Sequence, residues 1–258
     1  MQRRWLLYVR ISKKQYNETL YNENTLYMNS QISFNNKELK AGQADVNEGV
    51  YTTIPSRLLY SIDEKETWHE LGWTSKMAVN ANAYIFCVYG VEFCAEFYDK
   101  STNTYRYVIP WNVIKQFECD EDAEIMVILN TEELNQAFLS KAEELGMRGK
   151  IAPVKYDLEE RQKDPQYIHE VMMDSFESVF HKYKQGYDEQ KEVRFAVVCP
   201  DKPDYYKMKL KFENQLLTRR FAVVQGAYIV IDIHGLTFDE EGNVKNFSPQ
   251  MELYYGYK

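Results

Sequence analysis

Cysteine is scarce in this sequence, and its spacing argues against two kinds of site. The chain holds only Cys87, Cys94, Cys119 and Cys199 among 258 residues. None of them forms a Cys-x-x-Cys pair, so the pattern gives little support to a zinc finger or a dithiol redox centre. Isolated thiols suit buried positions in a reducing compartment, and we therefore expect a cytoplasmic protein.

Long apolar runs are also missing from the chain. No segment approaches the ~20 consecutive apolar residues that a helix needs to cross a bilayer. The apolar run that follows Arg3 and Arg4 is too short for the core of a signal peptide. We therefore expect a protein that has no membrane partner.

The sequence lacks the fingerprints of several large enzyme classes. It contains no Gly-x-Ser-x-Gly elbow, no P-loop and no dinucleotide-binding glycine pattern, so hydrolase, NTPase and Rossmann interpretations have no support. Its histidines have no carboxylate or cysteine neighbours at metal-ligand spacing. They are His69, His169, His181 and His234. We expect structural or surface roles for them, and no metal site.

Acidic residues and tyrosines are abundant. The 31 basic and 39 acidic residues give a formal net charge of -8. This balance argues against general affinity for a nucleic-acid backbone, although it leaves room for a local basic site. The 21 tyrosines, against only 11 glycines and 7 prolines, indicate an ordered, aromatic-rich fold. Tyrosine stacks on nucleobases and nicotinamide, but it more commonly packs half-buried sheets.

Hydrophobic periodicity predicts an α+β fold. Alternating or β-branched segments predict strands over residues 5–11, 25–28, 31–34, 84–91, 105–109, 124–129, 151–156, 205–212, 221–225 and 228–233. Apolar residues at helical spacing predict helices over 12–20, 131–146 and 164–183, with Ser12 and Asp164 as N-caps and Gly146 as a terminator. Gly226 is placed to join the last two strands in a hairpin. Blocks of strands with two long helices between them favour a single domain over residues 1–258, with a mainly antiparallel mixed sheet and two or more packed helices.

The turn that leads into residues 193–198 is the segment most suggestive of chemistry. In a strand, Gln190, Glu192 and Arg194 would share one face, and the apolar residues between them would share the other. The simpler interpretation is a half-exposed strand on which Glu192 and Arg194 are solvated charges. The other is a polar group placed for catalysis, and neighbouring motifs are needed to decide.

Two sets of residues carry a family resemblance. Gln190-Lys191-Glu192, at the start of a core strand, resembles the Gln/Glu-x-Glu motif of ADP-ribosyltransferases. Leu26-Tyr27-Met28-Asn29-Ser30, Asp45-Val46-Asn47-Glu48-Gly49 and Tyr187-x-x-Gln190-x-Glu192-x-Arg194 look like the successive blocks of a widespread bacterial and phage family. The order of these blocks agrees over roughly the first four-fifths of the chain. That family is similar in turn to DNA-modifying toxins of the ADP-ribosyltransferase type.

The resemblance implies an ADP-ribosyltransferase-like fold that takes NAD as its substrate, with an early arginine that binds a phosphate or ribose. Arg10 is the best match, because a guanidinium fork offers fixed and permanently charged donors. The family pattern places this arginine directly after an aromatic residue, whereas Val9 separates Tyr8 from Arg10 here. Arg4, on the same strand face, is therefore the reserve candidate.

The resemblance also implies roles for residues near the two ends of the chain. Glu192 would bond the nicotinamide ribose and stabilise the oxocarbenium-like charge that develops as nicotinamide leaves. Gln190 would orient the acceptor. Tyr27 or Ser33 would contact the nicotinamide.

Two functions follow from these observations. The first is an ADP-ribosyltransferase-like enzyme, or an NAD glycohydrolase, that modifies an unidentified macromolecule in phage–bacterium conflict as a toxin or in phage defence. The second is a non-enzymatic binding protein or inhibitor that engages a protein partner through an acidic, tyrosine-rich surface. The first function requires Arg10 and Glu192 to line one cleft with room for a dinucleotide.

Overall fold

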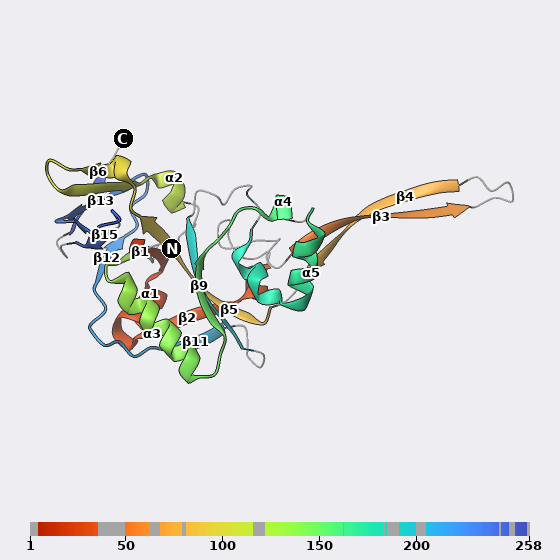
Figure 1. Ribbon diagram of the computed structural model, residues 1–258, viewed down its shortest axis with the longest axis horizontal. Helices are drawn as coiled ribbons and strands as arrows, with labels where there is room; N and C mark the ends of the chain where they lie inside the picture. Colours follow the sequence, from red (N-terminus) through yellow and green to blue (C-terminus); the bar gives the residue numbers. More distant parts are fainter. Residues whose placement is uncertain are drawn as a thin grey trace.

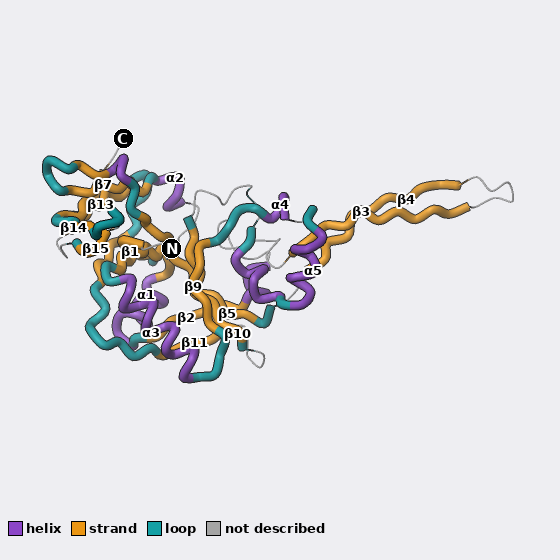
Figure 2. Tube along the Cα trace, viewed as in Figure 1, coloured by secondary structure: helices purple, strands orange, loops and turns teal. Residues whose placement is uncertain are grey.

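The computed structural model describes residues 5–35, 50–61, 68–78, 81–115, 122–161, 163–182, 184, 191–199, 205–242, 244–247 and 251–256. Within these ranges the chain forms an α+β fold whose strands pair almost entirely in antiparallel fashion, which confirms the expected fold class. Figure 2 shows strands, helices and loops together in the body, and a pair of strands in a long projection from it.

The main sheet contains eight strands. They are β1 (Trp5–Lys13), β2 (Thr25–Ser30), β5 (Ala83–Glu92), β8 (Ala123–Ile128), β9 (Gly149–Pro153), β10 (Glu192–Val198), β11 (Tyr205–Lys209) and β12 (Thr218–Ala222). The order is β11-β2-β5-β1-β8-β12, and β10 lies between β5 and β9. The two ends of β5 pair with different strands on one side, because β2 pairs with Tyr84 and Ile85 while β1 pairs with residues 89–92.

A second sheet packs against part of the main sheet. Its strands are β6 (Tyr98–Asp99), β7 (Thr104–Ile109), β13 (Tyr228–His234) and β16 (Met251–Gly256), in the order β16-β13-β7-β6. Two short strands, β14 (Thr237–Phe238) and β15 (Val244–Asn246), form a separate pair. Alternate apolar residues of β1 and β8, such as Val9 and Val127, share a core cluster with Ile231 of β13.

Helices cover the remaining faces. The α-helices are α1 (Lys14–Glu23), α2 (Trp111–Ile114), α3 (Thr131–Glu144), α4 (Leu158–Arg161) and α5 (Pro165–Met173). The 3-10 helices are η1 (Gln31–Asn35), η2 (Ala95–Phe97) and η4 (Ser175–Phe180). No helix within the described residues is long and apolar enough to cross a membrane.

The two faces of the main sheet have different neighbours. On one, the α3 face, Phe195 of β10 makes edge-to-face contacts with Tyr8, Phe86 and Phe138, the last from α3. On the other, the opposite face, Ala196 of β10 packs in a cluster with Phe180 of η4. Successive residues of β10 therefore belong to different cores, as a strand requires.

A long two-stranded ribbon extends from the body (Figure 1). It consists of β3 (Val50–Ser61) and β4 (Trp68–Ala78), which pair antiparallel along their whole length. Helix α5 contacts β3 and lies near the base of the ribbon. Within the residues that the structure describes, neither strand pairs with the main sheet.

The sequence located most elements correctly, but it was wrong about the helix expected over 164–183. Asp164 caps α5 as expected, because its side chain accepts a hydrogen bond from the Gln166 N–H at 2.9 Å. The helix ends at Met173 because Asp174 adopts an extended backbone and its side chain accepts from the Phe176 N–H. This local bond competes with the helix and starts η4.

Three further expectations were wrong. Residues 31–34 form the 3-10 helix η1 rather than a strand. Ser12 does not cap α1, since its hydroxyl bonds to the Asn17 side chain instead. The hairpin at Gly226 does not form, because β12 pairs with β8 in the main sheet whereas β13 pairs with β7 and β16 in the second sheet.

Candidate functional site

Glu192 is the first residue of β10 and follows a strained backbone position. Lys191 has a φ of 40°, in the left-handed region that non-glycine residues rarely adopt. The Lys191 carbonyl accepts a hydrogen bond from the Gly90 N–H at 3.0 Å. A Cβ atom at Gly90 would lie 2.6 Å from Val193 Cγ2, so only glycine permits this approach. The start of β10 is thus held firmly against β5.

The Glu192 carboxylate is buried between two cations. Its Oε1 accepts from Arg194 Nε at 2.7 Å, and its Oε2 accepts from Lys182 Nζ at 2.9 Å. Arg194 has no exposed surface, and its Nη1 also donates to the Val179 carbonyl. Only 7% of Glu192 is exposed. The interpretation of Glu192 and Arg194 as solvated charges was therefore wrong.

The surroundings of Glu192 keep it ionised. Burial alone would raise the pKa of Glu192, but Arg194, Lys182 and a hydrogen bond from Cys87 outweigh it and hold this pKa well below its ordinary value. Burial and the charge of Glu192 raise the pKa of the Cys87 thiol and of the Tyr156 phenol. Cys87 is therefore a protonated neighbour rather than a thiolate nucleophile.

Arg10 lies in the middle of the main sheet, on the α3 face. Its guanidinium carbon sits 4.0 Å from the centroid of the Phe86 ring, and its Nε donates to Ser12 Oγ at 3.2 Å. Burial lowers the pKa of Arg10 to about 10. Among the residues that the structure describes, no carboxylate forms an ion pair with Arg10.

The structure does not bring Arg10 and Glu192 together. Phe195 pairs with Phe86, the ring beneath Arg10, whereas Arg194 pairs with Cys87 one position further along β5. Since successive residues alternate between faces, Arg10 points to the α3 face and Glu192 to the opposite face. The backbone of the sheet therefore separates the two side chains.

The other predicted site residues have local partners or lie outside the described residues. Tyr27 of β2 stacks between Tyr16 and Tyr205, with ring centroids at 4.6 and 5.0 Å. The Ser33 hydroxyl donates to the Ser30 carbonyl within η1 at 2.6 Å. Gln190, the reserve Arg4 and the block at residues 45–49 are outside the described ranges.

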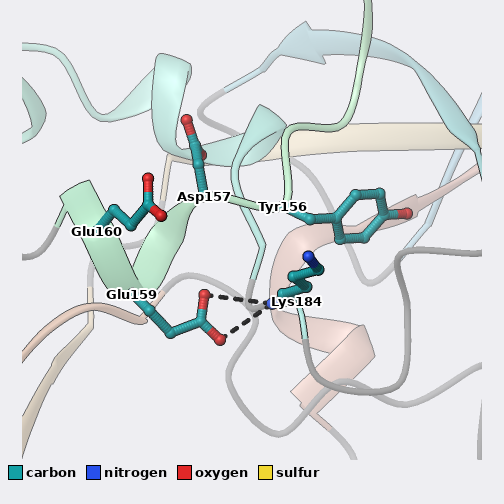
Figure 3. A pocket seen from close by; sticks show the side chains of 5 residues that line it. All are labelled: Tyr156, Asp157, Glu159, Glu160 and Lys184. Carbon is teal, nitrogen blue, oxygen red and sulfur yellow. Dashed lines mark hydrogen bonds between the residues drawn. The ribbon is translucent and has the colours of Figure 1, made fainter.

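An acidic depression lies near Glu192 in space, because one of its lining residues, Tyr156, is a neighbour of Glu192. It is open, has a volume of about 380 Å³, and is lined by Tyr156, Asp157, Glu159, Glu160 and Lys184. In Figure 3 the Glu159 carboxylate reaches the Lys184 backbone N–H, at 3.0 and 3.3 Å, while Glu160 points away from this contact. Three carboxylates, one tyrosine and one lysine thus line this depression.

Asp157 in this depression belongs to a polar group that the sequence did not reveal. Its carboxylate lies 2.6 Å from His181 Nδ1 and accepts from Arg161 Nε at 2.9 Å. Burial lowers the pKa of His181 in spite of the Asp157 charge, so the imidazole is neutral near pH 7 and donates from Nδ1. Asp157 and His181 are 24 positions apart in the sequence, and this spacing does not indicate that their side chains meet. A parallel bridge between Lys155 and His181 brings Asp157, two residues after Lys155, close to His181.

A second open depression includes Lys191, the middle residue of the Gln190-Lys191-Glu192 motif. Its volume is about 480 Å³, and Phe97 and Tyr107 are among its lining residues. The Lys191 ammonium donates to the Tyr107 hydroxyl at 2.9 Å, which lies 2.6 Å from the Tyr89 hydroxyl. These bonds link the start of β10 to the second sheet.

The described residues include no group of three or more histidine, cysteine, aspartate or glutamate side chains that is arranged to hold a metal ion. No protein family, curated protein or solved structure matches the chain. The site therefore has to be interpreted from its own geometry. It consists of one ionised carboxylate with its bonds satisfied inside the protein, and two shallow surface depressions that adjoin it.

Proposed function

We propose that this protein is a non-enzymatic binding protein or inhibitor that engages a basic segment of a protein partner. The observation that carries this proposal is the state of Glu192. Both of its oxygens accept from buried cations, and Arg10 points to the other side of the sheet. A carboxylate in this setting holds buried cations in the fold, and a substrate hydroxyl would have to displace a buried cation to reach it.

The acidic depression supports a basic partner. Tyr156 offers an aromatic surface at low conformational cost, and Asp157, Glu159 and Glu160 supply negative charge around it. Lys184 and Arg161, which pairs with Asp157 at 2.9 Å, compensate part of this charge. A lysine or arginine of the partner would place its alkyl stem on Tyr156 and its charged end among the carboxylates.

A peptide-binding measurement tests this proposal. The probe is a fluorescein-labelled peptide with lysine or arginine at alternate positions, measured by anisotropy against wild type and Glu159→Gln/Glu160→Gln. We expect the double variant to bind about tenfold more weakly, a change of about 1.4 kcal/mol. The matched control is Glu240→Gln/Glu241→Gln, which removes two exposed, adjacent carboxylates elsewhere. Equal binding by all three proteins, or none by wild type, would rule the proposal out.

The second candidate function is that of an ADP-ribosyltransferase-like enzyme that uses NAD. It is favoured by the Gln190-x-Glu192 spacing at the start of β10, and by an ionised glutamate beside two surface depressions. For NAD to reach Glu192, the Lys182 ammonium would have to leave Oε2. Gln190 would then orient the acceptor as the family resemblance implies.

One assay separates the two functions. Purified protein is incubated with labelled NAD, with and without cell lysate, and both NAD loss and transfer of label are measured. The enzyme requires turnover that Glu192→Gln abolishes and that Glu124→Gln retains. Glu124 is the matched control, because it is also a buried glutamate in a strand and is paired with Arg220 at 2.8 Å. If wild type neither binds nor consumes NAD, the enzymatic function is wrong.

A further inference from the structure

Three tyrosines form a continuous stack at the edge of the main sheet. Tyr16 of α1, Tyr27 of β2 and Tyr205 of β11 lie with successive ring centroids 4.6 and 5.0 Å apart, at interplanar angles of 28° and 14°. Tyr205 ends the stack and is 44% exposed. Among the described rings, Tyr27 is the one that packs on Tyr205, and the exposed part of Tyr205 is accessible at the end of the stack.

A row of lysines runs beside this stack. On the edge strand β11, the exposed positions are Tyr205, Lys207 and Lys209, whereas Met208 between the lysines is buried. Lys211 continues the alternation beyond the strand and is also exposed. Successive lysines are about 7 Å apart, two strand residues along the backbone.

The register fixes the lysines next to the rings. Lys207 pairs with Tyr27 and Lys209 pairs with Thr25, so the lysine row begins beside the middle ring of the stack and continues along β11. The structure records no ion pair between these lysines and any described carboxylate. On a chain with a net charge of -8, three lysines within five residues form a distinct local feature.

We propose that this edge of the sheet binds single-stranded nucleic acid, with one base stacked on the open ring of Tyr205 and the phosphates along Lys207, Lys209 and Lys211. Aromatic platforms take any base, since every base has a π face, and a basic groove follows the backbone. The surface is separate from the acidic depression, and its role does not depend on the function proposed for that depression.

Lysines on an edge strand have a second known use, which is to prevent two sheets from joining edge to edge. That use requires charged side chains on β11, but it does not require a stack of aromatic rings that ends in an exposed tyrosine. The two roles are separable by experiment, because edge protection predicts self-association when the charges are removed, whereas nucleic-acid binding predicts loss of a ligand.

The test is fluorescence anisotropy with labelled twelve-nucleotide homopolymers of deoxythymidine, deoxyadenosine, uridine and adenosine, which distinguish DNA from RNA. We expect wild type to bind with a dissociation constant of about 1–100 µM. Tyr205→Ala should bind about tenfold more weakly, and Tyr205→Phe should bind like wild type because it keeps the ring. Loss of affinity in both variants would contradict the stacking role.

The lysines are tested by their salt dependence. For single strands, each neutralised phosphate contributes a slope of about -0.7 in the logarithm of affinity against the logarithm of salt concentration, so removing three lysines should reduce the slope by about 2. The variant is Lys207→Gln/Lys209→Gln/Lys211→Gln. The control, Lys100→Gln/Lys115→Gln/Lys163→Gln, removes the same charge from exposed positions elsewhere and should keep the slope of wild type.

Three results would overturn the proposal. One is the absence of binding by wild type at about 100 µM protein. Another is an equal decrease of the salt-dependence slope in both triple variants, which would show that the effect depends only on the net charge of the protein. The third is self-association of the Lys207/Lys209/Lys211 variant in light scattering with unchanged nucleic-acid affinity, which would assign the lysines to edge protection.

Discussion

At Glu192, one carboxylate compensates two buried cations. Arg194 is completely buried and Lys182 is almost so, and both donate to this carboxylate. Removing one charge from this cluster leaves its partners buried without a counter-charge. The resulting loss of stability is larger than the net stability that the ion pair contributes. The cluster joins β10 to the segment after η4, and its main consequence is structural.

The first prediction concerns the stability that this carboxylate supplies. Glu192→Gln should lower the free energy of unfolding by about 3–5 kcal/mol, because Arg194 and Lys182 lose their counter-charge. Lys182→Met should cost less, since Glu192 and Arg194 stay paired at 2.7 Å. Urea denaturation at pH 7 measures both values. A larger loss for Lys182→Met than for Glu192→Gln would contradict this account of the cluster.

The second prediction is a pH dependence, and its sign follows from the lowered pKa of Glu192. The folded protein holds the Glu192 proton less tightly than the unfolded chain, whose glutamates titrate near ~4.3. The contribution of Glu192 is therefore complete above that pH and is lost as the pH falls below it. The difference in unfolding free energy between wild type and Glu192→Gln should shrink between pH 6 and pH 3. A difference that is constant over this range would show that Glu192 does not titrate as proposed.

At the scale of the element, the sequence predicted the positions of strands better than it predicted which strands pair with one another. Alternation of apolar residues located β1, β5 and β8, because each has at least one face buried against a core. It carried no information on pairing, so β12 and β13 were expected to form a hairpin and instead belong to different sheets. The sequence placed Glu192 and Arg194 on one face of β10 correctly. It did not show that Lys182, ten positions earlier, would complete the cluster.

The third prediction tests the close approach of β1, β5 and β10. A Cβ atom at Gly90 would lie 2.6 Å from Val193 Cγ2 and 2.7 Å from Trp5 Cδ1. Gly90→Ala should therefore destabilise the protein by about 1–3 kcal/mol through overpacking. Thermal unfolding measures the effect. The comparison is Gly242→Ala, where the added carbon has open space and only a positive φ of 83° opposes it, at about 1 kcal/mol. Equal effects of the two substitutions would mean that β10 can move away from β5.

At the scale of the whole molecule, the candidate surfaces lie on different parts of one sheet. The acidic depression involves residues next to β9 and α4, whereas the lysine row follows the edge strand β11. Arg10 and Glu192 were expected to meet because the family resemblance implies an early arginine and a late glutamate in one site. Their positions in the sequence did not determine which face of the sheet each side chain would occupy. That depended on the antiparallel register of β5 with β10 and of β1 with β5.

The last prediction concerns the β3–β4 ribbon, which projects from the body (Figure 1) and pairs with none of the other described strands. Thr53 and Lys76 face each other in its register. Replacing residues 54–75 by Asn-Gly should therefore close a shorter ribbon with a two-residue turn of the favoured type. Since an isolated two-stranded ribbon adds little stability of its own, the free energy of unfolding should change by less than about 1 kcal/mol. Urea denaturation, with circular dichroism as the probe, measures this change. A shortened protein that fails to fold would show that the ribbon is part of the core, and the body would then have to be regarded as incomplete without it.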